Sequence, residues 1–545
     1  MKLKNIKNIA LMLAVGCGFA VAPTACTDWD DHYESSADGG SNATLWEQLQ
    51  ANPQLSDFCE VLGKTELFRM HRKTGVTYAQ LLGSGQAFTV IAPVNGTFNK
   101  DSLLRLTETA QGDSMVEKSF VFNHLSRLIT SMKTTPQTLH LLNGKMVGMT
   151  ESTIQGVSIL TPNQRALNGV CHVASRALPY GFNIYEALCD DPDVSAVGAN
   201  LRQYEWDEFD PDASVSSGIV EGVPVYVDSV VYEHNRMLDA IGYLGSEDSV
   251  YWAVAPNSEV WNKVWEETSK YFVYDASYQK GDSLQRYWTN RALLDDAVFN
   301  MTDQRTTTDS LVSVPYLNWR KGYVAGKPVY HVYYKPFEPG GLLYGAQPVQ
   351  CSNGILYKAP QWPFTPEETY FKQIWTEGEG YNVVISDKLC RYASIRQVAD
   401  SISENSFLQI IPSNNTANWE ITFRLSNVLS GDYDVCAIIL PQTVINPDAT
   451  NLRPCKFKAT INYVDLDGKE QSYDCENTQF QSNAERVDTV VLAPAFHFPT
   501  TNYNQTSDKV SLKINCSITA RENARFSREM LLDCIYLRPR TTKDE

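Results

Sequence analysis

The spacing of apolar residues predicts the same helix and strand twice along the chain. Apolar residues fall at helical spacing over residues 45–58, and residues 184–197 repeat that spacing. An alternating strand that breaks at a proline follows each helix, over residues 88–95 in the first case and 251–257 in the second. The chain therefore begins with two copies of one helix-and-strand pattern.

Four sequence blocks occur twice in the same order, which indicates an internal duplication. The paired blocks begin at residues 45 and 184, 88 and 251, 121 and 298, and 168 and 353, so the offsets are 139, 163, 177 and 185 residues. The growing offsets indicate insertions in the second copy. In the last pair, Asn168-Gly169 and Asn353-Gly354 each predict a turn with positive φ that leads into a strand.

After residue 378 the helical spacing nearly disappears and short alternating runs take its place. About seven such runs follow, separated by turn signals such as Ser430-Gly431-Asp432 and Asp467-Gly468. This pattern is typical of an antiparallel β-sandwich. The predicted fold class is therefore α+β for the two copies, followed by an antiparallel β-sandwich domain.

The blocks of the first copy resemble those of the fasciclin domain. The sequences "FTVIAPVNGTF" (88–98), Asn-His (123–124), "LNGK" (142–145) and "NGVCHVASRALP" (168–179) match in order the family's Thr-Val-x-Ala-Pro block, central His, Leu-Asn-Gly turn and closing Asn-Gly block. Ser175 departs from the family, which has Asp there. In the second copy Met301 and Tyr357 replace the two histidines, so this copy resembles a degenerate fasciclin domain.

The resemblance implies a fold and a class of function. Fasciclin domains are α+β wedges, with a twisted antiparallel sheet in two layers and helices on one side, and the family is associated with cell adhesion and extracellular binding. The last predicted strand, residues 533–539, is similar to the closing strand of galactose-binding-like, jelly-roll modules. Sandwiches of that kind often carry sugar sites, but a fold by itself does not dictate a function.

The first 25 residues predict export. Three lysines precede an uncharged apolar run over residues 9–22, which is too short to span a bilayer and is typical of a signal peptide. Cys26 follows small residues and resembles the lipidated cysteine of bacterial lipoproteins, with Cys17 as a rival site. The acidic residues just after Cys26 resemble the surface-export signal of Bacteroidetes lipoproteins. We expect a lipid-anchored outer-membrane protein that faces outward.

The charge excludes some partners. There are 46 Lys and Arg against 63 Asp and Glu, which gives a formal net charge of −17. Such a chain repels nucleic-acid phosphates, so no nucleic-acid partner is expected. The 12 cysteines and 8 histidines are scattered and show no metal-ligand spacing, so neither a metal nor a cofactor is predicted. No phosphate loop or nucleophile motif is present, so the chain is predicted not to be an enzyme.

Four residues are candidates for binding. His124 has two interpretations, a surface contact in adhesion or a structural histidine that bonds a loop carbonyl. Trp362 lies between prolines in an aromatic stretch, where it can stack on a sugar or pack against the neighbouring domain. Trp319 and Trp419 are lesser candidates, as is Trp206. Tyr370, Phe371 and Trp375 follow Trp362 at helical steps.

These observations predict five segments and two candidate functions. The segments are a signal peptide (1–25), an acidic, Ser/Gly-rich tether (26–43), a fasciclin-like domain (44–182), a degenerate copy (183–378) and the sandwich (379–541). The first function is adhesion or extracellular binding of a protein or glycan. The alternative is an accessory glycan- or nutrient-binding lipoprotein of a TonB-dependent outer-membrane importer.

Overall fold

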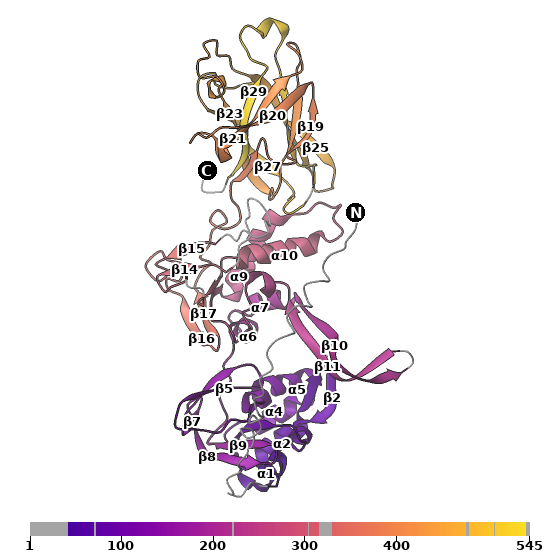
Figure 1. Cartoon of the computed structure of the whole chain (residues 1–545), viewed down its shortest axis with the longest axis vertical. Coiled ribbons are helices and arrows are strands. Elements are labelled where there is room, and N and C mark those ends of the chain that lie inside the picture. Colours follow the sequence, from indigo (N-terminus) through magenta and orange to yellow (C-terminus); the bar gives the residue numbers. More distant parts are fainter. Residues whose placement is uncertain are drawn as a thin grey trace, which may run out of the picture. The chain divides into compact units, whose positions relative to one another are not determined.

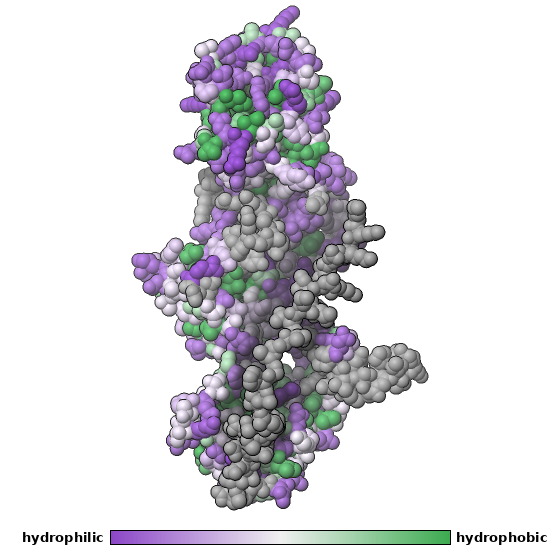
Figure 2. Space-filling model, viewed as in Figure 1, coloured by the Kyte–Doolittle hydropathy of each residue, from purple (hydrophilic) through white to green (hydrophobic). Residues whose placement is uncertain are grey.

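The computed structural model describes residues 42–69, 72–220, 223–302, 305–314, 330–475, 479–505 and 507–540 (Figure 1). The chain divides into two compact units, residues 1–179 and 180–545. Within the described residues, no helix is both long and apolar enough to cross a membrane. On the face that Figure 2 shows, hydrophobic residues lie in small groups among hydrophilic ones.

The first unit is an α+β domain built on a seven-stranded sheet of order β4-β3-β9-β8-β7-β6-β5. Helices pack against β3 and β9 through one apolar cluster that includes Leu45, Phe58 and Val90. In Figure 1 these helices and the strands β5 to β9 form separate layers. The elements are α1 (Leu45–Ala51), α2 (Ser56–Lys64), β1 (Glu66–Arg69), β2 (Arg72–Thr77), α3 (Tyr78–Leu82), β3 (Phe88–Pro93), α4 (Lys100–Leu106), α5 (Ala110–Val116), β4 (Leu125–Ser126), β5 (Gln137–His140), β6 (Met146–Met149), β7 (Thr153–Ile154), β8 (Val157–Ala166) and β9 (Gly169–Ala174).

The second unit begins with a smaller version of this arrangement. Its four-stranded sheet has the order β13-β12-β17-β16, and a long antiparallel hairpin, β10–β11, is inserted after the first two helices. The elements are α6 (Ile184–Asp190), α7 (Ser195–Arg202), β10 (Glu205–Val220), β11 (Val223–Asn235), α8 (Leu238–Ile241), β12 (Tyr251–Pro256), α9 (Ser258–Ser269), a 3-10 turn (Lys270–Phe272), α10 (Gly281–Leu294), β13 (Val298–Asn300), β14 (Ser310–Val312), β15 (Val332–Tyr334), β16 (Gln347–Cys351) and β17 (Gly354–Ala359).

The register of the central strands confirms the duplication that the sequence predicts. In the first unit β3 pairs in parallel with β9, and Phe88 faces Gly169. In the second unit β12 pairs in parallel with β17, and Tyr251 faces Gly354 in the same place. Each pair runs over six residues and ends with the proline that breaks the first strand, so the two copies share the same sheet centre.

A buried asparagine holds the same loops together in both copies. Asn168 accepts from the Leu45 backbone N–H at 2.8 Å, and its amide donates to the carbonyls of Leu82 and Ser84 at 2.9 and 2.8 Å. Asn353 accepts from the Ile184 N–H at 2.9 Å and donates to two carbonyls at 2.8 Å. A buried amide that satisfies three backbone groups fixes the chain locally. The repeated Asn-Gly block is therefore a shared structural element.

The last part of the second unit is an antiparallel sandwich of two six-stranded sheets, β20-β21-β29-β23-β27 with β18, and β19-β22-β28-β24-β25 with β26 (Figure 1). The α+β class and the sandwich are confirmed, but the count of about seven strands is wrong, because the described residues of the sandwich form twelve. The strands are β18 (Ile374–Glu377), β19 (Val384–Lys388), β20 (Cys390–Arg396), β21 (Ser406–Pro412), β22 (Glu420–Arg424), β23 (Gly431–Leu440), β24 (Lys456–Val464), β25 (Glu470–Asp474), β26 (Phe480–Gln481), β27 (Asp488–Phe498), β28 (Ser511–Cys516) and β29 (Met530–Pro539).

The aromatic stretch near residue 370 belongs to the sandwich, and its helical spacing is misleading. Trp375 lies on β18, which pairs with β29 and precedes the predicted sandwich start at residue 379. Tyr370 and Phe371 are buried in one apolar cluster with Phe272, Trp288 and the sandwich core. The α+β part and the sandwich of this unit thus share a core. The predicted domain boundaries themselves stay predictions.

Candidate functional site

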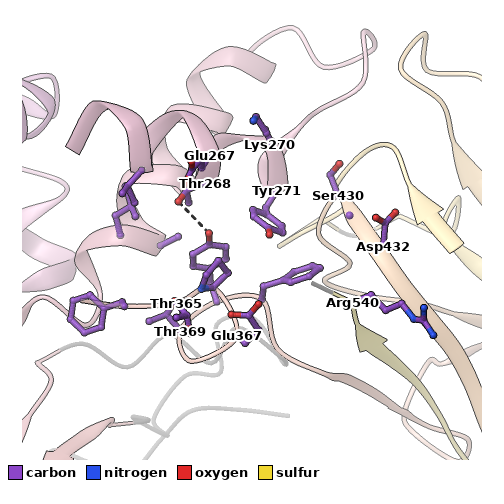
Figure 3. A pocket seen from close by; sticks show the side chains of 18 of the residues that line it. Glu267, Thr268, Lys270, Tyr271, Thr365, Glu367, Thr369, Ser430, Asp432 and Arg540 are labelled. Atoms are coloured by element: carbon purple, nitrogen blue, oxygen red, sulfur yellow. Dashed lines mark hydrogen bonds between the residues drawn. The ribbon is translucent and has the colours of Figure 1, made fainter. Parts of the chain in front are cut away.

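A pocket of about 800 Å³ lies in the second unit, between its α+β part and the sandwich (Figure 3). One wall comes from the end of α9 and the 3-10 turn after it, with Glu267, Lys270 and Tyr271. The loop over residues 362–371 forms a second wall. The sandwich contributes Asp432 and Arg540 from the ends of its strands. Pockets at domain interfaces are common binding sites, which makes this the candidate functional site.

Aromatic rings line the inner part of the pocket. Tyr271 lies against Phe371 at 4.5 Å and against Tyr370 at 5.4 Å between ring centroids. The Tyr370 hydroxyl donates to Thr268 Oγ1 at 3.2 Å, the bond drawn in Figure 3. Burial, and then the nearby carboxylates of Glu367 and other acids, raise the pKa of Tyr271. The tyrosine therefore stays a neutral hydrogen-bonding group at physiological pH.

A local turn places these rings. Thr365 donates from its backbone N–H and its hydroxyl to the Glu368 carboxylate at 3.2 and 2.9 Å, which is a capping arrangement. The Phe371 N–H donates to the Pro366 carbonyl at 2.7 Å. The two prolines and the capped turn restrict the backbone. The loop consequently holds Tyr370 and Phe371 against the pocket at little further entropic cost.

Charged groups of both signs surround the pocket mouth. His497 Nδ1 and Asp432 Oδ1 lie 2.7 Å apart, and both side chains are more than half exposed. The Arg540 N–H donates to the Asp432 carbonyl at 2.8 Å. Glu267 and Lys270 are exposed on the opposite wall. The mouth thus offers both donors and acceptors around an aromatic interior.

A smaller hollow of about 360 Å³ adjoins the pocket. The two share Glu367 and Phe371, and the smaller one is completed by Glu368, Lys372, Gln373 and Pro539. Lys372 and Gln373 directly precede β18, so the hollow leads from the pocket toward the sandwich sheet that contains β18 and β29.

Of the predicted binding residues that the structure describes, Trp362 alone lines the pocket. Its half-buried ring packs edge-on against Trp261 at 6.0 Å and Phe364 at 5.1 Å. Trp261 and Phe364 belong to the same α+β part as Trp362, so these contacts are not the packing against the neighbouring domain that the sequence suggested, and the ring also lines the pocket. Its role in binding stays a prediction.

The structure corrects two other candidates. His124 is fully buried, with Nδ1 2.7 Å from the Phe120 carbonyl and Nε2 accepting from the Leu178 N–H at 2.9 Å. A surface contact is therefore wrong, and the structural interpretation holds. Trp419 is also fully buried, and its Nε1 donates to the Arg528 carbonyl at 2.6 Å. It directly precedes β22, an inner strand of its sheet, and belongs to the apolar core of the sandwich.

The remaining candidates lie elsewhere. Trp206 is 49% exposed and stacks on His234 at 4.4 Å at the base of the β10–β11 hairpin, away from the residues of the pocket. Trp319 and Cys26 fall outside the described residues. Tyr271, Asp432 and His497 are pocket residues that the sequence did not single out. They come from three distant segments with no shared motif, so no signal in the sequence could have grouped them.

No metal or thiol chemistry is visible in the described residues. No group of three potential metal ligands occurs there. The ten described cysteines are free thiols, and eight of them are buried. Burial raises the pKa of Cys59 to about 11, which keeps that thiol protonated.

Comparison with known proteins finds no matching family model and no matching curated relative. Among solved structures, the chain is similar to a FAS1 domain pair from the insect cell adhesion molecule fasciclin I, with 11% identity, 58% of this chain and 99% of that chain covered, and a TM-score of 0.19. It is also similar to the CBM22-1 xylan-binding domain of Paenibacillus barcinonensis Xyn10C, with 13% identity, 30% and 85% coverage, and a TM-score of 0.18.

A third similar structure is the family 11 carbohydrate-binding module of Clostridium thermocellum in complex with a β-1,3-1,4-mixed-linked tetrasaccharide. It has 11% identity, 31% and 95% coverage, and a TM-score of 0.19. TM-scores this low decide neither fold nor function. The conclusions that follow therefore rest on the contacts within the chain.

Proposed function

We propose that this chain is a non-catalytic extracellular binding protein that holds a glycan in the pocket of the second unit. The observation that carries the proposal is the combination of an aromatic interior, formed by Tyr271 and Trp362, with a mouth of exposed donors and acceptors. A sugar presents apolar C–H faces that pack on rings and hydroxyl groups that bond to polar side chains. The pocket offers both kinds of surface within about 800 Å³.

The charge around the pocket favours a glycan over a strongly charged ligand. Glu267, Glu367 and Asp432 contribute negative charge, while Lys270, His497 and Arg540 can offset it. No single sign dominates, so a polyanion or a polycation would meet repulsion as well as attraction. A neutral, hydroxyl-rich ligand meets neither penalty and can use donors and acceptors of both kinds.

Adhesion is the second candidate function, and the first unit is the part of the chain that favours it. Its sequence blocks resemble the fasciclin domain, and Leu128 and Ile129 are adjacent and 60% and 61% exposed. Exposed neighbouring aliphatic side chains are typical of protein contacts. Adherence of the protein to host matrix, combined with no binding to any glycan, would favour adhesion over the glycan function.

The glycan proposal is tested with Trp362→Ala. We expect this variant to bind its polysaccharide about tenfold more weakly, because the ring loses stacking worth on the order of 1 kcal/mol. Affinity gels containing xylan, mixed-linkage β-glucan, mannan, starch or mucin glycans measure the retardation. Trp252→Ala is the matched control, since Trp252 is also half-buried in this domain but packs on Phe337 and Tyr357 outside the pocket. Equal retardation of both variants would contradict the proposal.

We further propose that acyl chains on Cys26 anchor the protein to the outer membrane, where it serves an importer as an accessory binding protein. The signal-peptide pattern and the acidic residues after Cys26 support this proposal. Cys26→Ser is expected to move the protein from the membrane fraction to the soluble fraction, because the thiol is the acylation site. Immunoblots of fractionated cells measure the shift. Retention of the variant on membranes after a salt wash would refute the anchor.

A further inference from the structure

The outer face of the sheet that contains β18, β29, β23 and β27 carries a row of apolar side chains. Trp375 pairs with Tyr536, Tyr536 with Cys436, and Cys436 with Val491 across the four strands. We call these four residues the stacking row. Their neighbours along each strand, such as Ile374 and Leu537, point inward and belong to the sandwich core. The row therefore lies on the outer face of the sheet, although Cys436 itself is fully buried beside Tyr536.

The stacking row is open to solvent at both ends. Trp375 is 38% exposed and Val491 is 42% exposed. The rings of Trp375 and Tyr536 lie 5.0 Å apart at an angle of 30°, so they pack against each other as one aromatic pair. An exposed tryptophan on a regular strand costs solvation free energy that a ligand would recover.

The same sheet face continues from the stacking row to the pocket. Two residues along from Tyr536, Arg538 bonds to Asp434, and its side chain is 55% exposed. Burial alone would raise the pKa of Asp434. The bonds from Arg538 and from the Ala495 N–H nevertheless hold this pKa below its usual value. Two residues further, Arg540 and Asp432 line the pocket mouth. Row and pocket are thus two ends of one surface.

The distance between the stacking row and the pocket sets the minimum length of a ligand that contacts both. Cys436 in the row and Asp432 at the pocket are four residues apart on β23, which corresponds to about 13 Å along a strand. One sugar ring is too short to reach both. A chain of several sugar residues can place one ring in the pocket and another on the row.

We propose that the pocket and the stacking row together form one track that binds an extended, linear glycan chain. The proposal rests on the glycan function proposed above and names its ligand class. In the track, Trp375 and Tyr536 pack against the C–H face of a sugar ring. Arg538, between the two ends, donates to hydroxyl groups from its exposed guanidinium.

A glycan fits this face better than a peptide does. A sheet presents side chains on its face and its backbone hydrogen-bonding groups only at its edges. An extended peptide lying on the face would therefore leave its own N–H and C=O groups without backbone partners. A sugar chain carries its polar groups on its ring edges, where Arg538 and the exposed pair of Asp432 and His497 can reach them.

The test compares ligand length. We take the polysaccharide that retards the full-length wild-type protein most in the affinity gels and measure titration calorimetry with its oligosaccharides, from disaccharide to octasaccharide. The wild type is expected to gain affinity with length. Trp375→Ala is expected to bind the disaccharide like the wild type and to lose about tenfold on the octasaccharide, as stacking on the row is lost.

Two further variants guard against a folding artefact. Val491→Glu leaves the aromatic pair in place but sets a charge in the row, and it is expected to lose the same length-dependent gain. Tyr381→Ala removes an aromatic residue that is 93% exposed and outside the row, and it is expected to behave like the wild type. Thermal unfolding of each variant, within a few degrees of wild type, confirms that the fold is intact.

The possible outcomes distinguish failure of the track from failure of the glycan binding on which it rests. Length-independent binding, or full octasaccharide affinity in Trp375→Ala and Val491→Glu together with a loss in Trp362→Ala, would overturn the track and leave the pocket function standing. Binding of an extended peptide to the row in place of the octasaccharide would overturn the ligand class. Failure of the wild type to bind any polysaccharide in the gels would overturn both proposals.

Discussion

Gly354→Ala is expected to destabilise the second unit by on the order of 3 kcal/mol, because the new Cβ has no space and the backbone is unfavourable for it. Gly354 has a φ of +146°, and a Cβ at this position would lie far inside contact distance of the Tyr251 carbonyl oxygen on β12. The Tyr251 carbonyl is part of the backbone, so it cannot rotate away from the new Cβ as a flexible side chain could. Either β12 or β17 must shift, and the parallel pair at the sheet centre weakens.

Hydrogen exchange of the β12 and β17 amides in the full-length protein measures the loss. Gly345→Ala is the matched control in the same unit. Gly345 has a φ of +77° but nothing within 4 Å of an added Cβ, so it reports the conformational cost alone, about 1 kcal/mol. If the two variants lose equal protection, close packing of the strands is not the reason for glycine at position 354.

The equivalent glycine of the first copy makes the same argument. A Cβ on Gly169, where φ is +154°, would lie 2.0 Å from the Phe88 carbonyl oxygen of β3. The Asn-Gly pair thus does two jobs in each copy: the asparagine amide ties three backbone groups, and the glycine lets two strands approach. This explains why the pair was visible in the sequence, since each requirement demands one residue type, although the partners lie far away along the chain.

The candidate site could not be predicted in the same way. Tyr271, Phe371 and Asp432 meet only because α9, a capped loop and a sandwich strand pack together, and no local pattern specifies that packing. The solvent exposure of the tryptophan side chains could not be predicted from the sequence either. Trp419 begins an alternating run and Trp375 follows an aromatic stretch at helical steps, but neither pattern shows that Trp419 lies in the core while Trp375 faces outward.

Short or exposed strands account for part of the error in the strand count. β18 to β21 and β26 were not among the runs that the sequence singled out. β26 has two residues and β18 has four, too few for alternation to be recognised. The residues of β20 are almost all exposed, so its polar character resembles that of a loop. Long strands such as β23 and β29 were recognised because most of their ten residues are buried and form long apolar runs.

His124 is expected to make the first unit less stable as the pH falls from 7 to 5. Burial lowers the pKa of the imidazole from 6.5 to about 4, so the folded state keeps it neutral while the unfolded state takes up a proton below pH 6.5. Stability is therefore complete above pH 6.5 and is lost progressively toward pH 4. The loss attributable to His124 amounts to about 2 kcal/mol at pH 5.

His124→Gln isolates this contribution. The variant is less stable than the wild type at pH 7, because the Leu178 N–H loses its partner, but we expect the difference to shrink by about 2 kcal/mol at pH 5. Exchange of the buried β3 and β9 amides measures the free energy of opening at each pH. His140→Gln, on the exposed side of β5, is the matched control for replacing a histidine by glutamine in this unit.

Comparing the wild type with His124→Gln also cancels opposing effects of pH on the stability of the second unit. Burial raises the pKa of Asp295 and of Asp533 to about 7, so these carboxyls stabilise their own unit as the pH falls, in the opposite direction to His124. Global unfolding curves would mix the two signs, whereas amides of β3 and β9 report on the first unit. A wild-type-to-variant difference that stays constant between pH 7 and 5 would show that His124 is not the neutral, buried histidine that its two hydrogen bonds require.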